Sequence, residues 1–152
     1  MKISKSKVLA HANPNGDTPP ATKLIVNTIA DWLNKVLPWI NKMTVGLDNI
    51  DFKVLKINAG RQVGNTFVLK AITDLYANDM VVLFCEQRMI KVHEFDRIPG
   101  IKAYSIFSID SMLKEEGLKD RVLFCDVPRE VISRETWNKI RQFGFEGIVC
   151  IG

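Results

Sequence analysis

The chain has 152 residues, of which 47% are hydrophobic and 25% charged, with a formal net charge of +4. This length suits one domain with a substantial core, and the composition is that of an ordinary soluble globular protein. No apolar run is long enough to span a bilayer and no signal-peptide core is present, so no membrane association is expected. We therefore expect a cytoplasmic protein.

The excess positive charge lies in the N-terminal part of the chain. Residues 1–56 contain eight lysines and four acidic residues, whereas residues 57–152 contain thirteen basic and thirteen acidic residues. Residues 1–16 are predicted to be a flexible basic leader. Basic N-terminal segments often contact nucleic acid, and the candidate contacts here are Lys2, Lys5, Lys7 and Lys23. A solvated lysine face that only adds solubility is the alternative.

Residues 17–152 are predicted to form a single α/β domain that opens with a helix. Thr18 is a candidate N-cap followed by proline at the first helical position, and Pro38 should end or kink the helix. Its apolar residues recur at helical spacing and are expected to cover the sheet rather than bind a partner. They are Leu24, Ile25, Ile29, Trp32, Leu33 and Val36.

Five apolar segments have the pattern of strands, and helical patterns separate them. The strands are predicted at 52–57, 80–85, 102–109, 121–126 and 147–151, and the helices between them at 66–76, 87–95, 111–117 and 133–143. This alternation predicts a three-layer α/β domain with a mainly parallel five-stranded sheet. The predicted core residues of the sheet are Val54, Ile57, Val82, Leu83, Leu123 and Phe124.

The turn at residues 58–64 is a candidate phosphate site. A strand that passes through a glycine-bearing turn into a helix is typical of P-loop proteins, because backbone N–H groups and the helix N-terminus both attract phosphate. Set against G-x-x-x-x-G-K-[ST], the frame beginning at Ala59 keeps Gly64 and Thr66 but has Asn65 in place of the lysine. The candidate phosphate-binding residues are Gly60, Arg61, Gln62, Val63, Gly64, Asn65 and Thr66.

A carboxylate follows two of the predicted strands, in Val82-Leu-Phe-Cys-Glu86 and Val122-Leu-Phe-Cys-Asp126. The carboxyl ends of parallel strands are where ligands bind in open sheets. We favour Asp126, because its strand can lie beside the strand that precedes the glycine turn. In P-loop enzymes a hydroxyl and a carboxylate hold Mg²⁺, and Thr66 and Asp126 are the candidate metal ligands here.

The order of these motifs resembles the ATPase domain of viral large terminase subunits and their helicase-like relatives. The resemblance covers roughly residues 52–152 and rests on segments 61–66, 123–126 and 148–151. It implies a P-loop NTPase fold with Mg²⁺ and ATP or GTP as ligands. Two departures weaken it: Asn65 replaces the phosphate-binding lysine, and Val127 replaces the glutamate that positions water. Because phosphoryl transfer depends on positioning and charge stabilisation, we expect weak nucleotide binding and no catalytic residues.

The leading interpretation is a non-catalytic pseudo-NTPase that binds or regulates a nucleic-acid-processing machine. If the resemblance holds, the protein is virus-encoded and lies in the host-cell cytoplasm. One alternative is a weak Mg-dependent NTPase of terminase or helicase type that uses Arg61, which would reach a phosphate, and Asp126, with Glu130 one short turn beyond. Another is a protein-interaction domain that binds no nucleotide, where Gly60 and Gly64 only make a tight turn.

Cysteine and histidine add little at this stage. Cys85, Cys125 and Cys150 are far apart, form no C-x-x-C pair and lie in apolar runs, so they are predicted to be buried thiols in a reducing compartment without a metal or disulfide role. His11 lies in the leader, and His93 is expected on a solvated helix surface. The aromatic residues fall mostly on core stripes, so no platform for stacking nucleic-acid bases is predicted.

Overall fold

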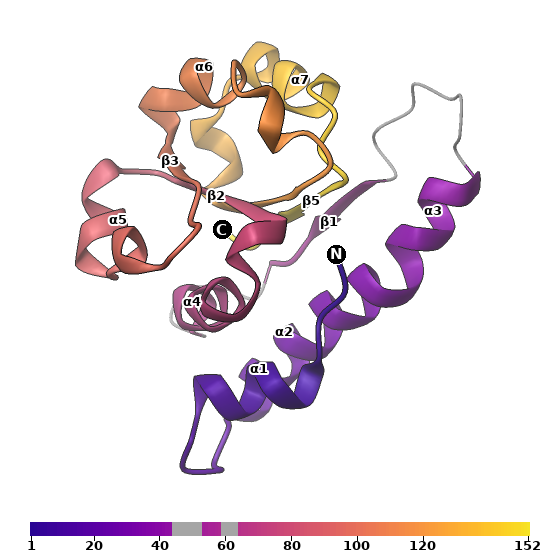
Figure 1. Ribbon diagram of the computed structural model, residues 1–152, viewed down its shortest axis with the longest axis vertical. Coiled ribbons are helices and arrows are strands. Elements are labelled where there is room, and N and C mark those ends of the chain that lie inside the picture. Colours follow the sequence, from indigo (N-terminus) through magenta and orange to yellow (C-terminus); the bar gives the residue numbers. More distant parts are fainter. Residues whose placement is uncertain (44–52, 59–63) are drawn as a thin grey trace.

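The computed structural model describes residues 1–43, 53–58 and 64–152, and its centre is an all-parallel sheet with helices on both faces (Figure 1). The predicted α/β fold class is therefore confirmed. The strand order is β1-β5-β4-β2-β3. The strands are β1 (Val54–Lys56), β2 (Met80–Phe84), β3 (Ala103–Ser105), β4 (Val122–Asp126) and β5 (Gly147–Cys150).

Burial across the sheet follows the position of each strand. All of β2 is buried, as is β4 up to Cys125, because helices cover both faces of these inner strands. Val82, Leu83, Leu123 and Phe124 are fully buried, as predicted. Val54 and Ile57 are only half-buried, because β1 lies at the edge of the sheet and, among the described strands, pairs with β5 alone.

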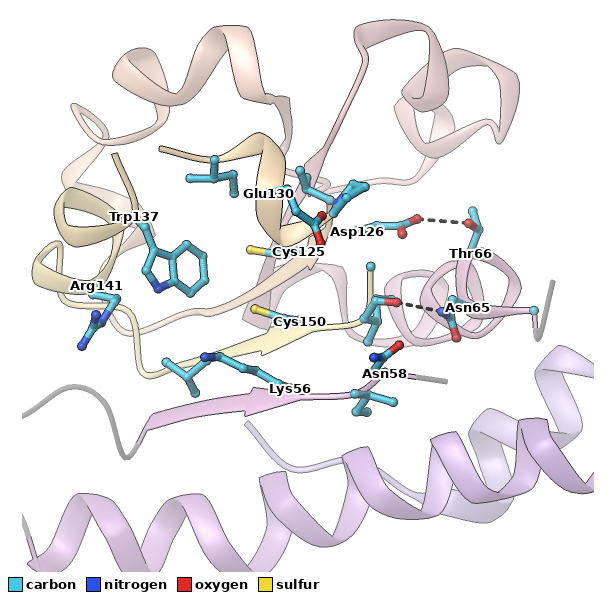
Figure 2. Close-up of a pocket in the computed structure, with 18 of the residues that line it drawn as sticks. Lys56, Asn58, Asn65, Thr66, Cys125, Asp126, Glu130, Trp137, Arg141 and Cys150 are labelled. Atoms are coloured by element: carbon cyan, nitrogen blue, oxygen red, sulfur yellow. Dashed lines mark hydrogen bonds between the residues drawn. The ribbon is translucent and has the colours of Figure 1, made fainter. Parts of the chain in front are cut away.

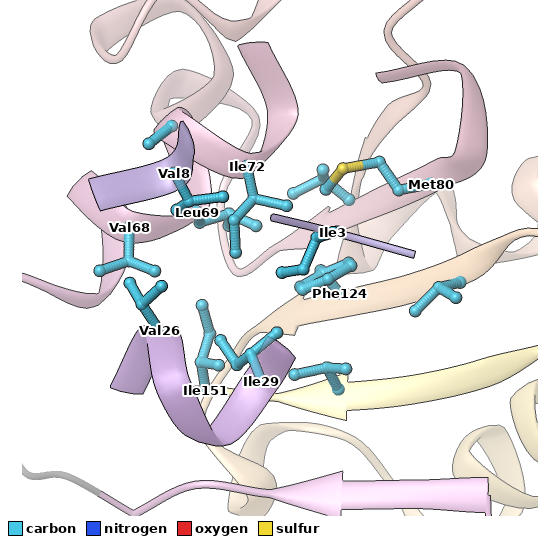
Figure 3. Packing of buried hydrophobic residues seen from close by; sticks show 14 of the residues in the cluster. Ile3, Val8, Val26, Ile29, Val68, Leu69, Ile72, Met80, Phe124 and Ile151 are labelled. Carbon is cyan, nitrogen blue, oxygen red and sulfur yellow. The ribbon is translucent and has the colours of Figure 1, made fainter. Parts of the chain in front are cut away.

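Two helical layers enclose the sheet. One face packs against α1 (Lys5–Ala12), α2 (Pro20–Asp31), α3 (Leu37–Met43), α4 (Asn65–Tyr76) and α5 (Gln87–Val92). The other face packs against α6 (Ile109–Met112) and α7 (Arg134–Gln142). In the first layer, side chains such as Val26 and Ile29 of α2 and Leu69 of α4 lie around Phe124 and Ile151 (Figure 3).

The N-terminal segment departs from the flexible leader that the sequence suggested. Residues 5–12 form α1, and Ile3, Val8 and Ala12 are buried in the core (Figure 3). The Asn34 side chain accepts a hydrogen bond from the Ile3 N–H at 2.8 Å and donates one to the Ile3 carbonyl at 2.7 Å. Residues 1–16 therefore belong to the same packed unit as the sheet, since the lysines point outward while the apolar residues between them point inward.

The long N-terminal helix also differs from its prediction at both ends. It begins at Pro20, with Pro19 rather than Thr18 at the N-cap, and it does not stop at Pro38. Proline has no N–H to donate, and a π turn at Trp32–Val36 precedes it, in which the Leu37 N–H bonds to the Trp32 carbonyl. This wide turn accommodates the hydrogen bond that Pro38 cannot donate, so the helix continues from α2 through the π turn into α3 without a break (Figure 1).

The apolar stripe of this helix is narrower than predicted. Ile25, Ile29, Trp32 and Leu33 are buried, whereas Leu24 and Val36 are 67% and 42% exposed.

Within the described ranges, no helix has the length and apolar character needed to cross a membrane.

The third strand is much shorter than the predicted 102–109. Ser105 is the last residue of β3 and pairs with Phe84, the last residue of β2. Beyond this point the chain has no strand to pair with, so residues 106–108 turn into a short 3₁₀ helix and α6 starts at Ile109 instead of Ser111. The predicted 87–95 helix likewise ends early, at Val92.

Candidate functional site

A cavity with a volume of about 1640 Å³ lies at the carboxyl edge of the sheet. The ends of β1, β4 and β5, the first turn of α4 and one face of α7 line it (Figure 2). Among the lining residues are Asn58, Thr66, Asp126, Trp137 and Cys150. This is the edge at which the sequence predicted a ligand site.

Thr66 and Asp126, the two predicted metal ligands, meet in this cavity. The Thr66 hydroxyl donates a hydrogen bond to Asp126 Oδ2 at 3.0 Å (Figure 2). The expected route to this contact was wrong, however, because β4 does not lie beside β1. Strand β5 lies between them, so it is the placement of α4, and not strand adjacency, that brings Thr66 to Asp126.

The environment of Asp126 raises the pKa of its carboxyl group. Burial raises the pKa of Asp126 above its ordinary value, whereas the hydrogen bond from Thr66 and the charge of His93 act in the opposite direction. Burial is the largest of these effects. His93, which the sequence placed on a solvated helix surface, is in fact half-buried and lines the cavity.

Gly64 and Asn65 shape the start of α4. Gly64 is the N-cap and has a left-handed backbone with φ of 77°, a conformation that glycine adopts without steric cost. The Asn65 side-chain N–H donates to the Ile151 carbonyl at 2.7 Å, which ties the helix to the end of β5 (Figure 2). The other predicted phosphate-binding residues lie outside the described residues: Gly60, Arg61, Gln62 and Val63.

The charged residues that line the cavity are mainly basic. Among the described residues, four of them are Lys or Arg (Lys56, Lys70, Arg134 and Arg141), whereas two are acidic (Asp126 and Glu130). Lys70 also forms an ion pair with Asp74 at 3.0 Å. An anionic ligand therefore fits the charge of this cavity better than a cationic one.

One face of α7 contributes residues that the sequence analysis did not select. Arg134, Trp137, Asn138 and Arg141 are spaced three, four and seven positions apart, which places them on one face of the helix. Trp137 had been assigned to the core, but it is half-buried and lines the cavity. The same helical spacing, applied to polar residues as well as apolar ones, would have found this face.

A Mg²⁺ ion is compatible with Thr66 and Asp126 if the ligand completes its coordination. No group of three or more His, Cys, Asp or Glu side chains that could hold a metal occurs in the part of the chain that the structure describes. Thr66 and Asp126 instead offer a hydroxyl and a carboxylate oxygen. Mg²⁺ prefers oxygen ligands and commonly takes one or two carboxylates together with water and substrate phosphates.

Two cysteines that are distant in sequence lie side by side in the cavity. Cys125 of β4 and Cys150 of β5 are direct partners in the sheet, and both line the cavity. Their proximity cannot be predicted from the sequence pattern, because the pattern does not specify which strands are neighbours.

The four candidate nucleic-acid-binding lysines lie away from this cavity, on the N-terminal segment and α2. Lys5 forms an ion pair with Asp31 at 2.7 Å, so part of its charge is compensated within the protein. Lys2, Lys7 and Lys23 are exposed. Their contact with nucleic acid stays a prediction.

In comparisons with known proteins, the chain matches no protein-family model, no curated protein and no solved structure. Inference about its function therefore depends on the site itself.

Proposed function

We propose that the chain is a non-catalytic binding protein whose cavity takes a nucleotide, with Mg²⁺ between the phosphates and the protein. The observation that carries this proposal is the hydrogen bond between Thr66 and Asp126 in a cavity with a mainly basic lining. It brings together the two oxygen-bearing groups that a Mg²⁺–phosphate complex requires.

The rest of the cavity suits the other parts of a nucleotide. Lys56 and Arg134 pair with no acidic side chain among the described residues, so their charges are available to phosphate. The N-terminus of the twelve-residue helix α4 adds partial positive charge on the same side. Trp137 lies at the opposite end of the cavity from Thr66 and offers an aromatic face for a base (Figure 2).

Two substitutions support binding without turnover. Asn65 occupies the position of the phosphate-binding lysine, and its side-chain N–H is bonded to the Ile151 carbonyl. Val127 occupies the position of the water-activating glutamate and is only 4% exposed. Loss of one transition-state donor costs about 10²–10³ in rate, so two such losses leave little turnover.

A bound nucleotide in such a protein would act as a signal. In this hypothesis the chain works in the cytoplasm, where thiols stay reduced, and reports nucleotide state to a nucleic-acid-processing machine. The resemblance to viral terminase ATPase domains motivates the choice of machine.

A weak Mg-dependent NTPase is the second candidate, and the same Thr66–Asp126 contact favours it. An interaction domain without nucleotide is the third. In its favour, the exposed side of α3 and the preceding turn carries large apolar residues, with Trp39 62% and Met43 60% exposed.

Titration calorimetry with ADP and GDP, each with and without Mg²⁺, tests the proposal. We expect binding that needs Mg²⁺ and weakens about tenfold in Lys56→Gln and in Arg134→Gln, since each variant removes a charge next to phosphate. Lys114→Gln is the matched control, because Lys114 is exposed and does not line the cavity. Failure of every nucleotide to bind would reject the proposal and favour the interaction domain.

A phosphate-release assay with Mg-ATP and Mg-GTP separates the first two candidates. The non-catalytic proposal predicts no release above that of Asp126→Ala. Turnover of about 1 s⁻¹ or more that disappears in Asp126→Ala would instead establish the weak NTPase.

A further inference from the structure

The cavity contains a pair of cysteines whose geometry suits a covalent bond. Strands β4 and β5 are parallel neighbours, and Cys125 and Cys150 lie directly opposite each other. Opposite residues in a parallel pair point to the same side of the sheet, and Figure 2 shows both sulfur atoms on one side. Neighbouring strands are about 4.8 Å apart, which lies within the Cα separation of about 4.4–6.8 Å that disulfides adopt.

The third cysteine is a poor partner for either of them. The register pairs Leu83 of β2 with Cys125, so Cys85 lies two positions further along the sheet. Two residues of strand add about 6.6 Å to the spacing between strands, which gives a Cα separation of about 8 Å. A disulfide does not span more than about 7 Å without backbone movement. Strand β2 is not a neighbour of β5, so Cys85 is also remote from Cys150.

The two thiols differ in their access to solvent. Cys125 is fully enclosed, with 1% exposure, whereas Cys150 is half-buried, and both line the cavity. The two thiols are hydrogen-bonded to each other. An oxidant that enters the cavity therefore meets Cys150 first, and Cys125 is the thiol beside it that can resolve the product.

We propose that Cys125 and Cys150 form a reversible disulfide when the reduced chain encounters hydrogen peroxide. The Cys150 sulfur attacks one peroxide oxygen, the O–O bond breaks, and the products are a sulfenic acid on Cys150 and one water molecule. The Cys125 sulfur then attacks the Cys150 sulfur and displaces the sulfenic hydroxyl, which leaves with the Cys125 proton as a second water molecule. Two thiols lose two electrons in total, and one peroxide is reduced to two waters.

The disulfide would join the carboxyl ends of β4 and β5, and residues at both ends line the cavity. Cys125 precedes Asp126, and Cys150 precedes Ile151, whose carbonyl accepts the hydrogen bond from Asn65. Oxidation would thus link β4 to β5 next to both groups. Disulfide formation itself does not depend on whether the cavity binds a nucleotide.

Counting thiols by mass spectrometry tests the proposal. The reduced full chain is treated with an equimolar amount of hydrogen peroxide, quenched with catalase, denatured and alkylated with N-ethylmaleimide. The three cysteines are unbridged in the structure, so the untreated chain should take up three maleimides. After peroxide we expect one maleimide, on Cys85, and dithiothreitol should restore all three. Digestion of the oxidised chain should yield a peptide that links Cys125 to Cys150.

Single variants act as controls. Cys85→Ser should still form the bridge and take up no maleimide after oxidation, whereas Cys125→Ser and Cys150→Ser should form no intramolecular bridge. The linked peptide from the wild-type chain decides the result even if one variant fails to fold. Three maleimides on the treated wild-type chain, a bridge that involves Cys85 or a second copy, or oxygen addition to Cys150 without a bridge would each overturn the proposal.

Discussion

The Thr66 hydroxyl lies 3.0 Å from Asp126 Oδ2, and this hydrogen bond joins the first turn of α4 to the end of β4. The two residues are 60 positions apart in the chain. The bond partly offsets the cost of burying a carboxylate, which is otherwise unfavourable to the folded state. Thr66 and Asp126 therefore contribute to the stability of the fold and also line the cavity.

Asp126→Asn should make the protein less sensitive to pH in the acidic range. Because burial raises the folded-state pKa of Asp126 above its ordinary value of 3.8, the folded state holds the proton more tightly than the unfolded state. The contribution of Asp126 to the free energy of unfolding is therefore greatest at low pH and falls as the pH rises through the folded-state pKa.

The asparagine variant is neutral at all pH values and can still accept from Thr66. We expect its melting temperature at pH 7 to exceed that of the wild type by about 1–3 °C, with a smaller difference at pH 3.5. Thermal melts across this range provide the measurement. A variant that is less stable than the wild type at pH 7 would show that the carboxylate is net stabilising.

Thr66→Val should lower stability at neutral pH, because it removes the hydroxyl donor and leaves the half-buried carboxylate with one partner fewer. Hydrogen bonds to charged groups contribute about 1.5–3 kcal/mol, and partial exposure places this one at about 1 kcal/mol. Thr66→Ser keeps the hydroxyl and is the matched control. Urea unfolding of the two variants should differ at pH 7; equal midpoints would mean that the hydrogen bond contributes nothing measurable.

Asn34→Ala should destabilise the fold by about 1–3 kcal/mol. The Asn34 side chain accepts a hydrogen bond from the Ile3 N–H at 2.8 Å and donates one to the Ile3 carbonyl at 2.7 Å, and both bonds are partly buried. Their loss leaves the Ile3 N–H and carbonyl without these partners. Asn27→Ala, an exposed position on the same helix, is the control and should change the free energy of unfolding by less than about 0.5 kcal/mol. Equal effects of the two variants would show that the Ile3 contact is not stabilising.

Gly147→Ala should also destabilise the protein, by about 1–3 kcal/mol, because the added methyl group overpacks the core. Its Cβ would lie 2.9 Å from Leu37 Cδ2 and 2.9 Å from Trp32 Cη2, on the helix that covers β5. Gly117→Ala is the matched control, since nothing lies within 4 Å of the added atom. Urea unfolding midpoints should separate the two variants, and a neutral Gly147→Ala would mean that this helix can shift away from β5.

If the N-terminal lysines bind nucleic acid, the triple variant Lys2→Gln, Lys7→Gln and Lys23→Gln should weaken DNA binding and its salt dependence. Each lost phosphate contact should reduce the slope of log K against log salt by about 0.9. Anisotropy of a labelled DNA duplex over a salt series measures this slope. A triple variant at Lys91, Lys114 and Lys139 removes the same charge elsewhere and should keep the slope. No binding at low salt would leave the lysines as solubilising charge.

Deletion of residues 1–16 is not a usable version of this test. Val8 is fully buried and Ile3 is 5% exposed, so the truncation would remove part of the core as well as the lysines. Burial of an aliphatic side chain contributes about 1.5–3 kcal/mol, which is a large share of the stability of a small domain.

The sequence was sufficient for the fold class because β2 and β4 are continuous apolar runs, a pattern that parallel sheets produce when both faces are covered. It was insufficient for strand order, which depends on how the layers pack at long range. The half-buried state of Val54 and the pairing of Cys125 with Cys150 both follow from that order, and so neither could be read from local pattern.

The candidate site, like the fold, could be predicted only in part from the sequence. Thr66 and Asp126 were found because each lies at a junction that the strand and helix patterns mark. Lys56, Arg134 and Trp137 were missed because the cavity acquires them from β1 and α7, whose positions around the sheet no local rule specifies. The Ile3–Asn34 contact was missed for the same reason. A hydrogen bond between a side chain and a distant backbone group produces no periodic pattern in the sequence.

The pairing of β1 has a consequence for the order in which the protein folds. Val54 pairs with Ile148, so among the described strands β1 has only β5 as its partner, and β2, β3 and β4 are synthesised between the two. Until β5 is synthesised, β1 has an unpaired backbone, and the helices that precede it lack part of the surface they cover. Sheet completion therefore waits for contacts of long sequence separation, which predicts slow folding and places the interval before β5 emerges as the stage most exposed to aggregation.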